Sequence, residues 1–371
     1  MSGRIAIVLG TRPEMIKLAS VIALLGVQAA TVHTGQHFNS TMSEHIGTGL
    51  NMPPWSMKLG IGGTRRGSQL GVAIASLDDL FAAERPTAVV VQGDTNSALA
   101  GAIAANAHAI PLIHVEAGLR SFDRRMPEES NRVLTDHLAD MCCAPTELNR
   151  RNLLREGIPP ERIVVTGNTV VEAVSSALPD RTARLATARR FELVENQYVL
   201  ATLHRPENVD DETTLRHLLT ELASLPAPVV LPLHPRTQRQ VAEFGLEHLL
   251  RRLTCTEPLV YRDFVALAHG AALVVSDSGG LQEEVTVLKR PIVVVRRSTE
   301  RPEIEGVFGT LAPPGPGLGA VLREWLATAG ERRERLVRLP SPYGDGMASS
   351  RVTRLIKEQA ALPPGPSSTA A

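Results

Sequence analysis

The chain has 371 residues, of which 43% are hydrophobic and 21% charged, a composition typical of folded globular proteins with room for two domains. Lys and Arg total 39, as do Asp and Glu, so the formal net charge is zero and excludes a general attraction to nucleic acid or to an anionic membrane. Aromatic residues make up 3%, too few for the stacking surfaces that bind single-stranded nucleic acid.

The three cysteines, Cys142, Cys143 and Cys255, have neither metal-ligand spacing nor a disulfide pattern. We therefore interpret them as buried free thiols in a reducing compartment. The first residues lead directly into an apolar strand and lack the core of a signal peptide, and no apolar run approaches the roughly 20 residues of a membrane span. These features predict a cytoplasmic protein without a membrane partner.

The first half of the chain alternates short apolar runs, which we predict to be strands, with helical segments. The predicted strands cover residues 5–9, 30–34, 89–91, 112–115, 141–144 and 163–166, and the predicted helices cover 15–25, 70–83 and 149–156. Strands that alternate with helices indicate βαβ units and a parallel sheet. The first part of the glycine-rich stretch 60–71 is predicted to be a loop, and its Arg65 and Arg66 either contact a ligand or are solvated.

The first predicted strand ends in a turn that suits an anion. Thr11 and Glu14 form a capping-box pattern, and Pro13 falls in the first helical turn. Free amides, the helix dipole and Arg12 together favour a phosphate, although an ordinary turn with a surface arginine explains the stretch equally well. The Gly-x-Gly-x-x-Gly spacing of dinucleotide-binding turns is absent.

Acidic residues follow two neighbouring strands of the predicted sheet. Asp94 comes just after the run 89–91, Glu116 comes just after 112–115, and Glu128 lies at the next predicted helix start. Ligands of open parallel sheets bind at the carboxyl ends of the strands. Carboxylates gathered at that edge are candidates for acid/base chemistry.

The charged helical stretch 180–190 breaks the rhythm, and the alternation then restarts. Predicted strands cover 198–203, 229–233, 272–276 and 292–295, a last helix covers 349–361, and the Pro/Gly/Ser/Ala-rich tail 362–371 is predicted to be disordered. We accordingly expect an N-terminal domain over residues 1–172 and a C-terminal domain over 173–348.

The second half carries its own anion-binding pattern. After the run 272–276, Ser278 can cap a helix while Gly279 and Gly280 let backbone amides approach a ligand. Glu284, about one turn later, can reach a vicinal diol such as a ribose; a simple glycine turn is the alternative. His204 and His234 each follow a strand, at equivalent ends, although a lone histidine is more often structural.

These motifs stand in the order found in the non-hydrolysing UDP-N-acetylglucosamine 2-epimerases, a family that the chain resembles from Ile5 to about Lys357. The motifs are Gly10-Thr11-Arg12-Pro13-Glu14, Gly93-Asp94-Thr95, His114-Val115-Glu116-Ala117-Gly118-Leu119-Arg120, Pro127-Glu128-Glu129-x-Asn131-Arg132, Gly167-Asn168-Thr169, Asp277-Ser278-Gly279-Gly280-x-Gln282-Glu283-Glu284, Thr299-Glu300-Arg301-Pro302-Glu303 and Tyr343-Gly344-Asp345-Gly346. Eight collinear motifs are specific, whereas any one alone is weak.

The resemblance implies an α/β fold of the glycosyltransferase-B type, with two Rossmann-like parallel-sheet domains facing across a cleft and a C-terminal helix crossing back to the first domain. It implies catalytic roles for Asp94, Glu116, Glu128 and His204 and no cofactor or metal. The substrate-binding residues that it implies are Arg12, Lys17, Arg120, Arg132, His234, Phe264, Ser278, Gly279, Gly280, Glu284 and Arg301. It also suggests a homodimer.

The reaction implied is C2 epimerisation of UDP-N-acetylglucosamine. The C2 hydrogen is not next to a carbonyl, so UDP must leave first, after which a carboxylate can remove the C2 proton to give 2-acetamidoglucal. Protonation from the opposite face and re-addition of UDP give the manno epimer. A glycosyltransferase of the same fold, a hydrolysing epimerase and a non-catalytic nucleotide-sugar sensor remain alternatives.

Two parts of the sequence depart from the family pattern or leave the substrate open. Many members carry a regulatory substrate site, for which Gln36, His37, Arg65, Arg66 and Gln69 are candidate remnants, whereas Asn39 and Val133 do not fit. The stretches 33–38 and 121–126 resemble a branch that includes epimerases of 3-acetamido uronic-acid sugars. The groups at C3 and C6 of the sugar are therefore open.

Overall fold

The structure is a computed structural model that describes residues 3–36, 52–63 and 65–361. The predicted disordered tail, residues 362–371, the regulatory candidate His37, and Asn39, which departs from the regulatory pattern, lie outside the described residues. The chain divides into two compact units. Unit 1 comprises Met1–Ala173 and Tyr343–Ala371, and unit 2 comprises Val174–Pro342.

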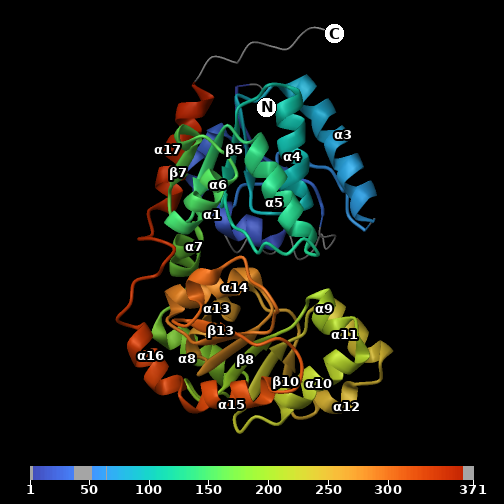
Figure 1. The fold of residues 1–371 in the computed structure, drawn as a ribbon, viewed down its shortest axis with the longest axis vertical. Helices are drawn as coiled ribbons and strands as arrows, with labels where there is room; N and C mark the ends of the chain where they lie inside the picture. The colour runs from blue at the N-terminus through green and yellow to red at the C-terminus, as the bar shows by residue number, and fades with distance from the viewer. Residues whose placement is uncertain (1–2, 37–51, 64, 362–371) are drawn as a thin grey trace. The chain divides into compact units, whose positions relative to one another are not determined.

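Unit 1 is built on a seven-stranded parallel sheet in the order β3-β2-β1-β4-β5-β6-β7. Figure 1 shows this unit, with β5 and β7 labelled among its helices. Its strands are β1 (Ile5–Leu9), β2 (Ala29–His33), β3 (Met57–Lys58), β4 (Ala88–Gln92), β5 (Leu112–Val115), β6 (Met141–Ala144) and β7 (Ile163–Val165). The central strands are buried throughout, which explains their continuous apolar runs.

Helices cover both faces of this sheet. They are α1 (Arg12–Leu25), α3 (Arg66–Glu84), α4 (Asn96–Ala107), α5 (Pro127–Leu138), α6 (Glu147–Arg155), α7 (Val170–Ala177) and α17 (Ala348–Ala360), with short 3-10 turns at Gly26–Gln28 and Pro160–Arg162. One apolar cluster joins the sheet to α3 and α4, and a second joins it to α1 and α17. The last helix of the chain thus completes the core of unit 1.

Unit 2 repeats the architecture with six parallel strands in the order β10-β9-β8-β11-β12-β13. The strands are β8 (Val199–Thr202), β9 (Val229–Pro232), β10 (Thr254–Thr256), β11 (Leu273–Ser276), β12 (Ile292–Val294) and β13 (Gly309–Leu311). The helices are α8 (Arg181–Arg189), α9 (Pro206–Val209), α10 (Glu212–Ala223), α11 (Pro235–Glu243), α12 (Glu247–Leu250), α13 (Tyr261–Gly270), α14 (Gly279–Leu288), α15 (Leu318–Ala327) and α16 (Ala329–Leu336), with a 3-10 turn at Pro302–Ile304.

The predicted fold class is confirmed, since both units are Rossmann-like parallel sheets. The predicted strands match the observed ones to within one or two residues. The edge strands β3, β10 and β13 were not predicted because they are short and lack the continuous apolar run that marks the equally short β7 and β12. The predicted helix 15–25 starts earlier, at Arg12, because the chain enters the helix directly after Thr11.

Each sheet reverses its strand order once, between β1 and β4 in unit 1 and between β8 and β11 in unit 2. At such a switch point, the helices that follow the two neighbouring strands leave toward opposite faces, which opens a crevice where ligands of this fold class bind. Each unit therefore has one position at which its sheet favours a ligand.

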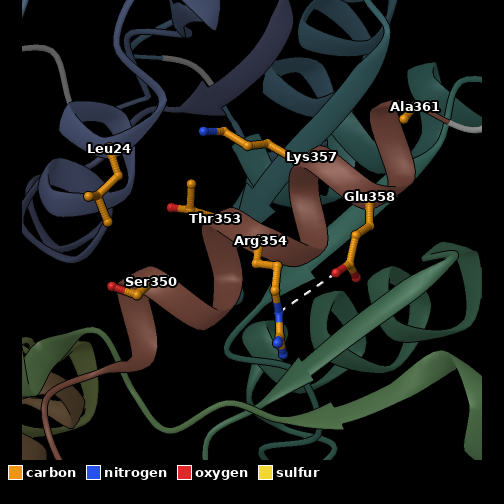
Figure 2. A pocket seen from close by; sticks show the side chains of 7 residues that line it. All are labelled: Leu24, Ser350, Thr353, Arg354, Lys357, Glu358 and Ala361. Carbon is orange, nitrogen blue, oxygen red and sulfur yellow. Dashed lines mark ion pairs between the residues drawn. The ribbon is translucent and has the colours of Figure 1, made fainter.

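A separate shallow cavity of about 550 Å³ lies where α1 meets α17. It is lined by Leu24, Ser350, Thr353, Arg354, Lys357, Glu358 and Ala361. Figure 2 shows Arg354 and Glu358 paired along one face of α17, with their nitrogen and oxygen 3.7 Å apart. This cavity shares no residue with the switch points. Within the described ranges, every helix is too short or too polar to cross a membrane.

Candidate active site

The turn after β4, which carries Asp94, is held at each of its residues by a different buried group. The Gly93 carbonyl accepts a hydrogen bond from Nε2 of His114 at 2.8 Å. The Asp94 carbonyl accepts from Nδ2 of Asn131 at 2.8 Å. The Thr95 hydroxyl donates to Glu14 at 2.7 Å and accepts from the backbone N–H of residue 98 at 3.0 Å. The position of Asp94 is therefore strongly determined.

The Asp94 carboxylate is partly exposed and pairs with the buried guanidinium of Arg132. Its side chain is 29% exposed and forms an ion pair with Nη2 of Arg132, whose side chain is only 3% exposed. Nη1 of Arg132 donates to Glu129 at 2.6 Å. Arg132 was predicted to bind substrate, but in the structure its guanidinium contacts two carboxylates of the protein.

Glu116 follows β5 directly and adopts a left-handed backbone conformation, with φ of 69°. Its own N–H and that of the next residue both donate to the Cys143 carbonyl at 3.1 Å, which stabilises this unusual geometry. Its carboxylate accepts from Nε2 of Gln92 at 2.7 Å and forms an ion pair with Lys17. A second predicted acid is thus fixed by a buried cation, at the end of the neighbouring strand.

Two adjacent glutamates at the start of α5 have different surroundings. Glu128, the predicted catalytic acid, is half-buried, and no described residue forms a hydrogen bond or ion pair with its side chain. Glu129 is buried, and it accepts hydrogen bonds from the backbone N–H and hydroxyl of Ser121 and from the Phe122 N–H, at 2.8–3.0 Å. Glu129 therefore shapes the preceding loop, whereas the side chain of Glu128 has no such contacts with the described residues.

The anion-binding prediction for the first turn needs one correction. The N–H groups of Gly10 and Thr11 are not free, because they donate to the Glu14 carboxylate at 2.9 and 2.7 Å. The predicted capping box is present. Arg12, the first residue of α1, is half-buried and remains the cationic group of this turn.

Arg120, also predicted to bind substrate, lies in a buried ionic network. Nη2 contacts Asp136 at 2.7 Å, and the guanidinium donates twice to Glu156, at 2.6 and 2.8 Å. Burial opposes its charge, but Glu156 and Asp136 together raise the pKa of Arg120. Asp136 also contacts Nδ1 of His114 at 2.6 Å. Because Nε2 of the same histidine binds the Gly93 carbonyl, this network supports the turn that carries Asp94.

The regulatory candidates among the described residues differ in their contacts and in their exposure to solvent. Oε1 of Gln36 accepts from the backbone and hydroxyl of Ser97 at 3.0 and 2.8 Å. Gln69 accepts from Asn96 at 2.7 Å, and Asn131 donates to Asn96 at 3.2 Å. Arg65 is exposed just before α3. Polar side chains thus link Gln69, through Asn96 and Asn131, to the turn that carries Asp94.

The switch point of unit 2 is organised by Asp277, which directly follows β11 and is fully buried. Oδ2 accepts from the backbone N–H groups of His204 and Arg205, both at 2.9 Å, and from Asn208 at 3.1 Å. Oδ1 contacts Nδ1 of His204 at 2.8 Å. Burial opposes ionisation, but the His204 charge and these hydrogen bonds lower the pKa of Asp277 to about 2.

His204 and His234 come together as predicted. Their ring centroids are 5.4 Å apart, and the His204 side chain is 37% exposed. Asp277 contacts Nδ1 of His204, so Nε2 is the ring nitrogen that this carboxylate does not contact. His234 is exposed and caps α11 by accepting from the Arg236 N–H at 3.2 Å.

The glycine turn before α14 has the predicted cap, since Ser278 accepts from the N–H of residue 281. A Cβ on Gly279 would lie 2.7 Å from Nη1 of Arg301 and from Oε1 of Glu300, whereas a Cβ on Gly280 would meet nothing within 4 Å. Arg301, predicted to bind substrate, is buried and paired with Glu283 and Glu300. The Arg301 guanidinium therefore packs closely against this turn at Gly279.

Two further candidates of unit 2 lie on the neighbouring helices. Glu284 is half-buried on α14, and its Oε1 accepts from the Tyr261 hydroxyl at 3.2 Å. Phe264 is half-buried on α13. No group of His, Cys, Asp or Glu in the described ranges is arranged to hold a metal ion. Burial raises the pKa of Cys143 to about 12, so this thiol is not a candidate nucleophile.

Comparison with known proteins identifies the family in which this architecture and these motifs occur together. The family model described as UDP-N-acetylglucosamine 2-epimerase matches residues 24–357. The chain belongs to this family.

Relatives and solved structures agree with the assignment. A UDP-N-acetylglucosamine 2-epimerase of Methanocaldococcus jannaschii is 36% identical, with 95% of this chain and 98% of that protein aligned. A UDP-2,3-diacetamido-2,3-dideoxy-D-glucuronate 2-epimerase of Pseudomonas aeruginosa is 35% identical, with 95% and 99% aligned. A crystal structure of the M. jannaschii enzyme in complex with UDP-GlcNAc and UDP has a TM-score of 0.84 and 37% identity, covering 96% of this chain and 99% of that one.

For this member of the epimerase family, sequence reasoning assigned no role beyond helix capping to Glu14 and none to Glu129. Both residues were visible in motifs, but their side-chain partners were not: Glu14 binds the distant Thr95, and Glu129 binds the loop residues Ser121 and Phe122. For Glu14 the signal in the sequence was indirect: a carboxylate in the first turn of a predicted helix, followed by apolar residues.

Proposed function

We propose that the protein interconverts UDP-N-acetylglucosamine and UDP-N-acetylmannosamine by elimination and re-addition of UDP. The observation that carries the proposal is the pair of acids at adjacent strand ends in unit 1, each with its own buried cation: Asp94 with Arg132, and Glu116 with Lys17. Glu128 supplies a third acid on α5. The UDP-GlcNAc seen in the M. jannaschii structure supports the choice of substrate class.

In the proposed first step, the bond between C1 and the phosphate oxygen breaks, and its electron pair leaves with UDP. A carboxylate takes the C2 proton, and the C2–H electrons form the C1=C2 double bond of 2-acetamidoglucal, in an anti elimination. The reverse step delivers a proton to the opposite face of C2 while the UDP oxygen rebinds C1, in a syn addition. Two acids on opposite faces of the ring meet this requirement.

The second unit would hold the leaving group. The Ser278 turn offers backbone N–H groups at a helix start, and His204 offers Nε2 while Asp277 balances its positive charge. Glu284 would hold the ribose. Arg12 would add a cation from the first unit. The proposed residues of unit 1 thus lie after β1, β4 and β5 and at the start of α5, and those of unit 2 lie after β8 and β11 and on α14.

A substrate with a C3 acetamido group and a C6 carboxylate is the second candidate. It is favoured by the P. aeruginosa relative, which aligns over 95% of the chain. The two candidates share every chemical step at C1 and C2 and differ in the substituents at C3 and C6.

The test is proton NMR of a panel of UDP-hexosamines incubated with the protein in D2O. We expect deuterium at C2 of the recovered substrate and the appearance of the manno epimer with UDP-N-acetylglucosamine. Absence of both from every sugar nucleotide would reject epimerisation, and stoichiometric release of free UDP would indicate a hydrolysing enzyme. Turnover only with an added acceptor would indicate a glycosyltransferase.

A further inference from the structure

The two turns at the switch point of unit 1 diverge toward opposite faces of the sheet. The turn after β1 carries Arg12 and leads into α1, which packs in the apolar cluster shared with α17. The turn after β4 carries Asp94 and leads into α4, which packs in the cluster on the other face. The spacing of Arg12 and Asp94 therefore depends on what joins these turns.

Glu14 joins them. It lies in the first turn of α1 and is 1% exposed. Its Oε2 accepts from the N–H groups of Gly10 and Thr11 at 2.9 and 2.7 Å, and its Oε1 accepts from the Thr95 hydroxyl at 2.7 Å. Thr95 is the residue after Asp94 and the N-cap of α4. One carboxylate thus connects both turns.

The surrounding packing leaves this connection little freedom. A Cβ on Gly10 would lie 2.2 Å from the hydroxyl oxygen of Ser97 and 2.2 Å from that of Thr34. The turn after β1 therefore packs closely against the start of α4, and the Glu14–Thr95 hydrogen bond also joins these two segments.

We propose that Glu14 is a positioning residue that fixes the spacing between Arg12 and Asp94. This inference rests on the proposed function. Arg12 acts on the departing diphosphate at C1 and Asp94 on the proton at C2, which are neighbouring atoms of one sugar. An error in their spacing slows the chemical step, because misplacement of a reacting group by about 1 Å can cost about 100-fold in rate.

The decisive variant is Thr95→Val, which removes the hydroxyl that Glu14 accepts from while preserving the shape of the side chain. Thr95→Ser restores the hydroxyl. Glu14→Gln is the second conservative variant, since its amide oxygen can accept from Gly10 and Thr11 while its amide N–H donates to Thr95.

Thr146→Val is the matched control. Thr146 caps α6 in the same unit, through a bond from the Asn149 N–H at 3.3 Å, and has no bond to Glu14. Both valine variants lose an N-cap worth about 1 kcal/mol, so a purely structural effect appears equally in both.

We expect Thr95→Val to lower kcat for C2 deuterium exchange by about 10-fold or more, with Thr95→Ser, Glu14→Gln and Thr146→Val within about 3-fold of the unaltered protein. The affinity for UDP, measured by calorimetry, stays within about 2-fold in all four, because the proposed UDP site lies mainly in unit 2. Equal losses of kcat in Thr95→Val and Thr146→Val, or none in Thr95→Val, would overturn the proposal.

Hydrogen exchange of backbone amides separates this inference from the proposed function. Thr95→Val should speed exchange of the amides of residues 94–97, and Thr146→Val should leave them unchanged, whatever reaction the protein catalyses. Unchanged exchange in Thr95→Val would refute the positioning role. Absence of C2 exchange in the unaltered protein, with faster amide exchange in Thr95→Val, would refute the function alone.

Discussion

At the scale of single residues, the carboxylates of unit 1 differ by what surrounds them. Glu14 and Glu129 are buried and accept backbone N–H groups, so they hold turns in place. Asp94 is partly exposed beside a cation, and Glu128 is half-buried without a described partner. Glu116 is buried as well, but it is bound by the side chains of Lys17 and Gln92, so burial alone does not distinguish the acids that hold turns.

Glu14 gives a prediction about stability and pH. Burial raises its pKa from the ordinary 4.5 to about 7, against the opposing hydrogen bonds from Thr95, Gly10 and Thr11. Between these two pH values the folded protein retains a proton that the unfolded chain has lost. The free energy of unfolding therefore falls as pH rises through this window. Glu14→Gln does not titrate, so its stability relative to the unaltered protein should rise by about 2–3 kcal/mol from pH 5 to pH 8.

Urea unfolding of both proteins at several pH values measures this difference, and all other titrating groups cancel in the comparison. A difference that stays constant between pH 5 and pH 8 would mean that Glu14 does not bind its proton more tightly in the folded state.

Glu128 and Glu147 form a matched pair for testing the third acid. Each lies in the first turn of a helix of unit 1, Glu128 in α5 and Glu147 in α6. Glu128→Gln should lower kcat for C2 exchange by about 100-fold or more, because an amide cannot transfer the proton, whereas Glu147→Gln should leave kcat unchanged. Equal rates for the two variants, measured by NMR in D2O, would remove Glu128 from the mechanism.

At the scale of elements, the start of α14 offers a test with two neighbouring glycines. Gly279→Ala would push a methyl group against the buried Arg301–Glu300 pair, so we expect a loss of about 1–3 kcal/mol and weaker UDP binding. Gly280→Ala meets no neighbouring atom and should be neutral or stabilising by up to about 1 kcal/mol. Urea unfolding and calorimetry with UDP compare the two; similar losses would show that the helix start itself, and not the ion pair, is sensitive.

The elements were more predictable than their connections. Buried strands such as β5 and β6 were predicted to the residue, because continuous apolar runs reflect burial on both faces. The strand ends correctly placed Asp94 and Glu116. The pairing of Arg132 with Asp94, and of Lys17 with Glu116, was not predictable, since it joins residues 38 and 99 positions apart. The structure also shows that Arg120, Arg132 and Arg301, which the motifs assigned to substrate, pair with carboxylates of the protein.

At the scale of the whole molecule, unit 1 depends on a helix that is distant in sequence. Ile356 of α17 is fully buried in the cluster shared with α1, and Lys357 beside it is exposed. Ile356→Ala should cost about 2–5 kcal/mol and Lys357→Ala should cost little. We expect amides of β1 and β4 to lose protection from hydrogen exchange in Ile356→Ala, while those of β8 and β11 keep it. Equal loss in both sheets would show that the units unfold together.

The dependence of unit 1 on α17 also bears on synthesis. A ribosome releases the strands and acids of unit 1 long before it makes Val352 and Ile356, which complete that unit's apolar cluster. Unit 2, by contrast, is one continuous segment that can close as soon as it emerges. A chain that ends before α17 would therefore have a folded second unit and a first unit whose apolar cluster is incomplete. Exposed apolar surface of this kind is what chaperones and proteases recognise in incompletely folded chains.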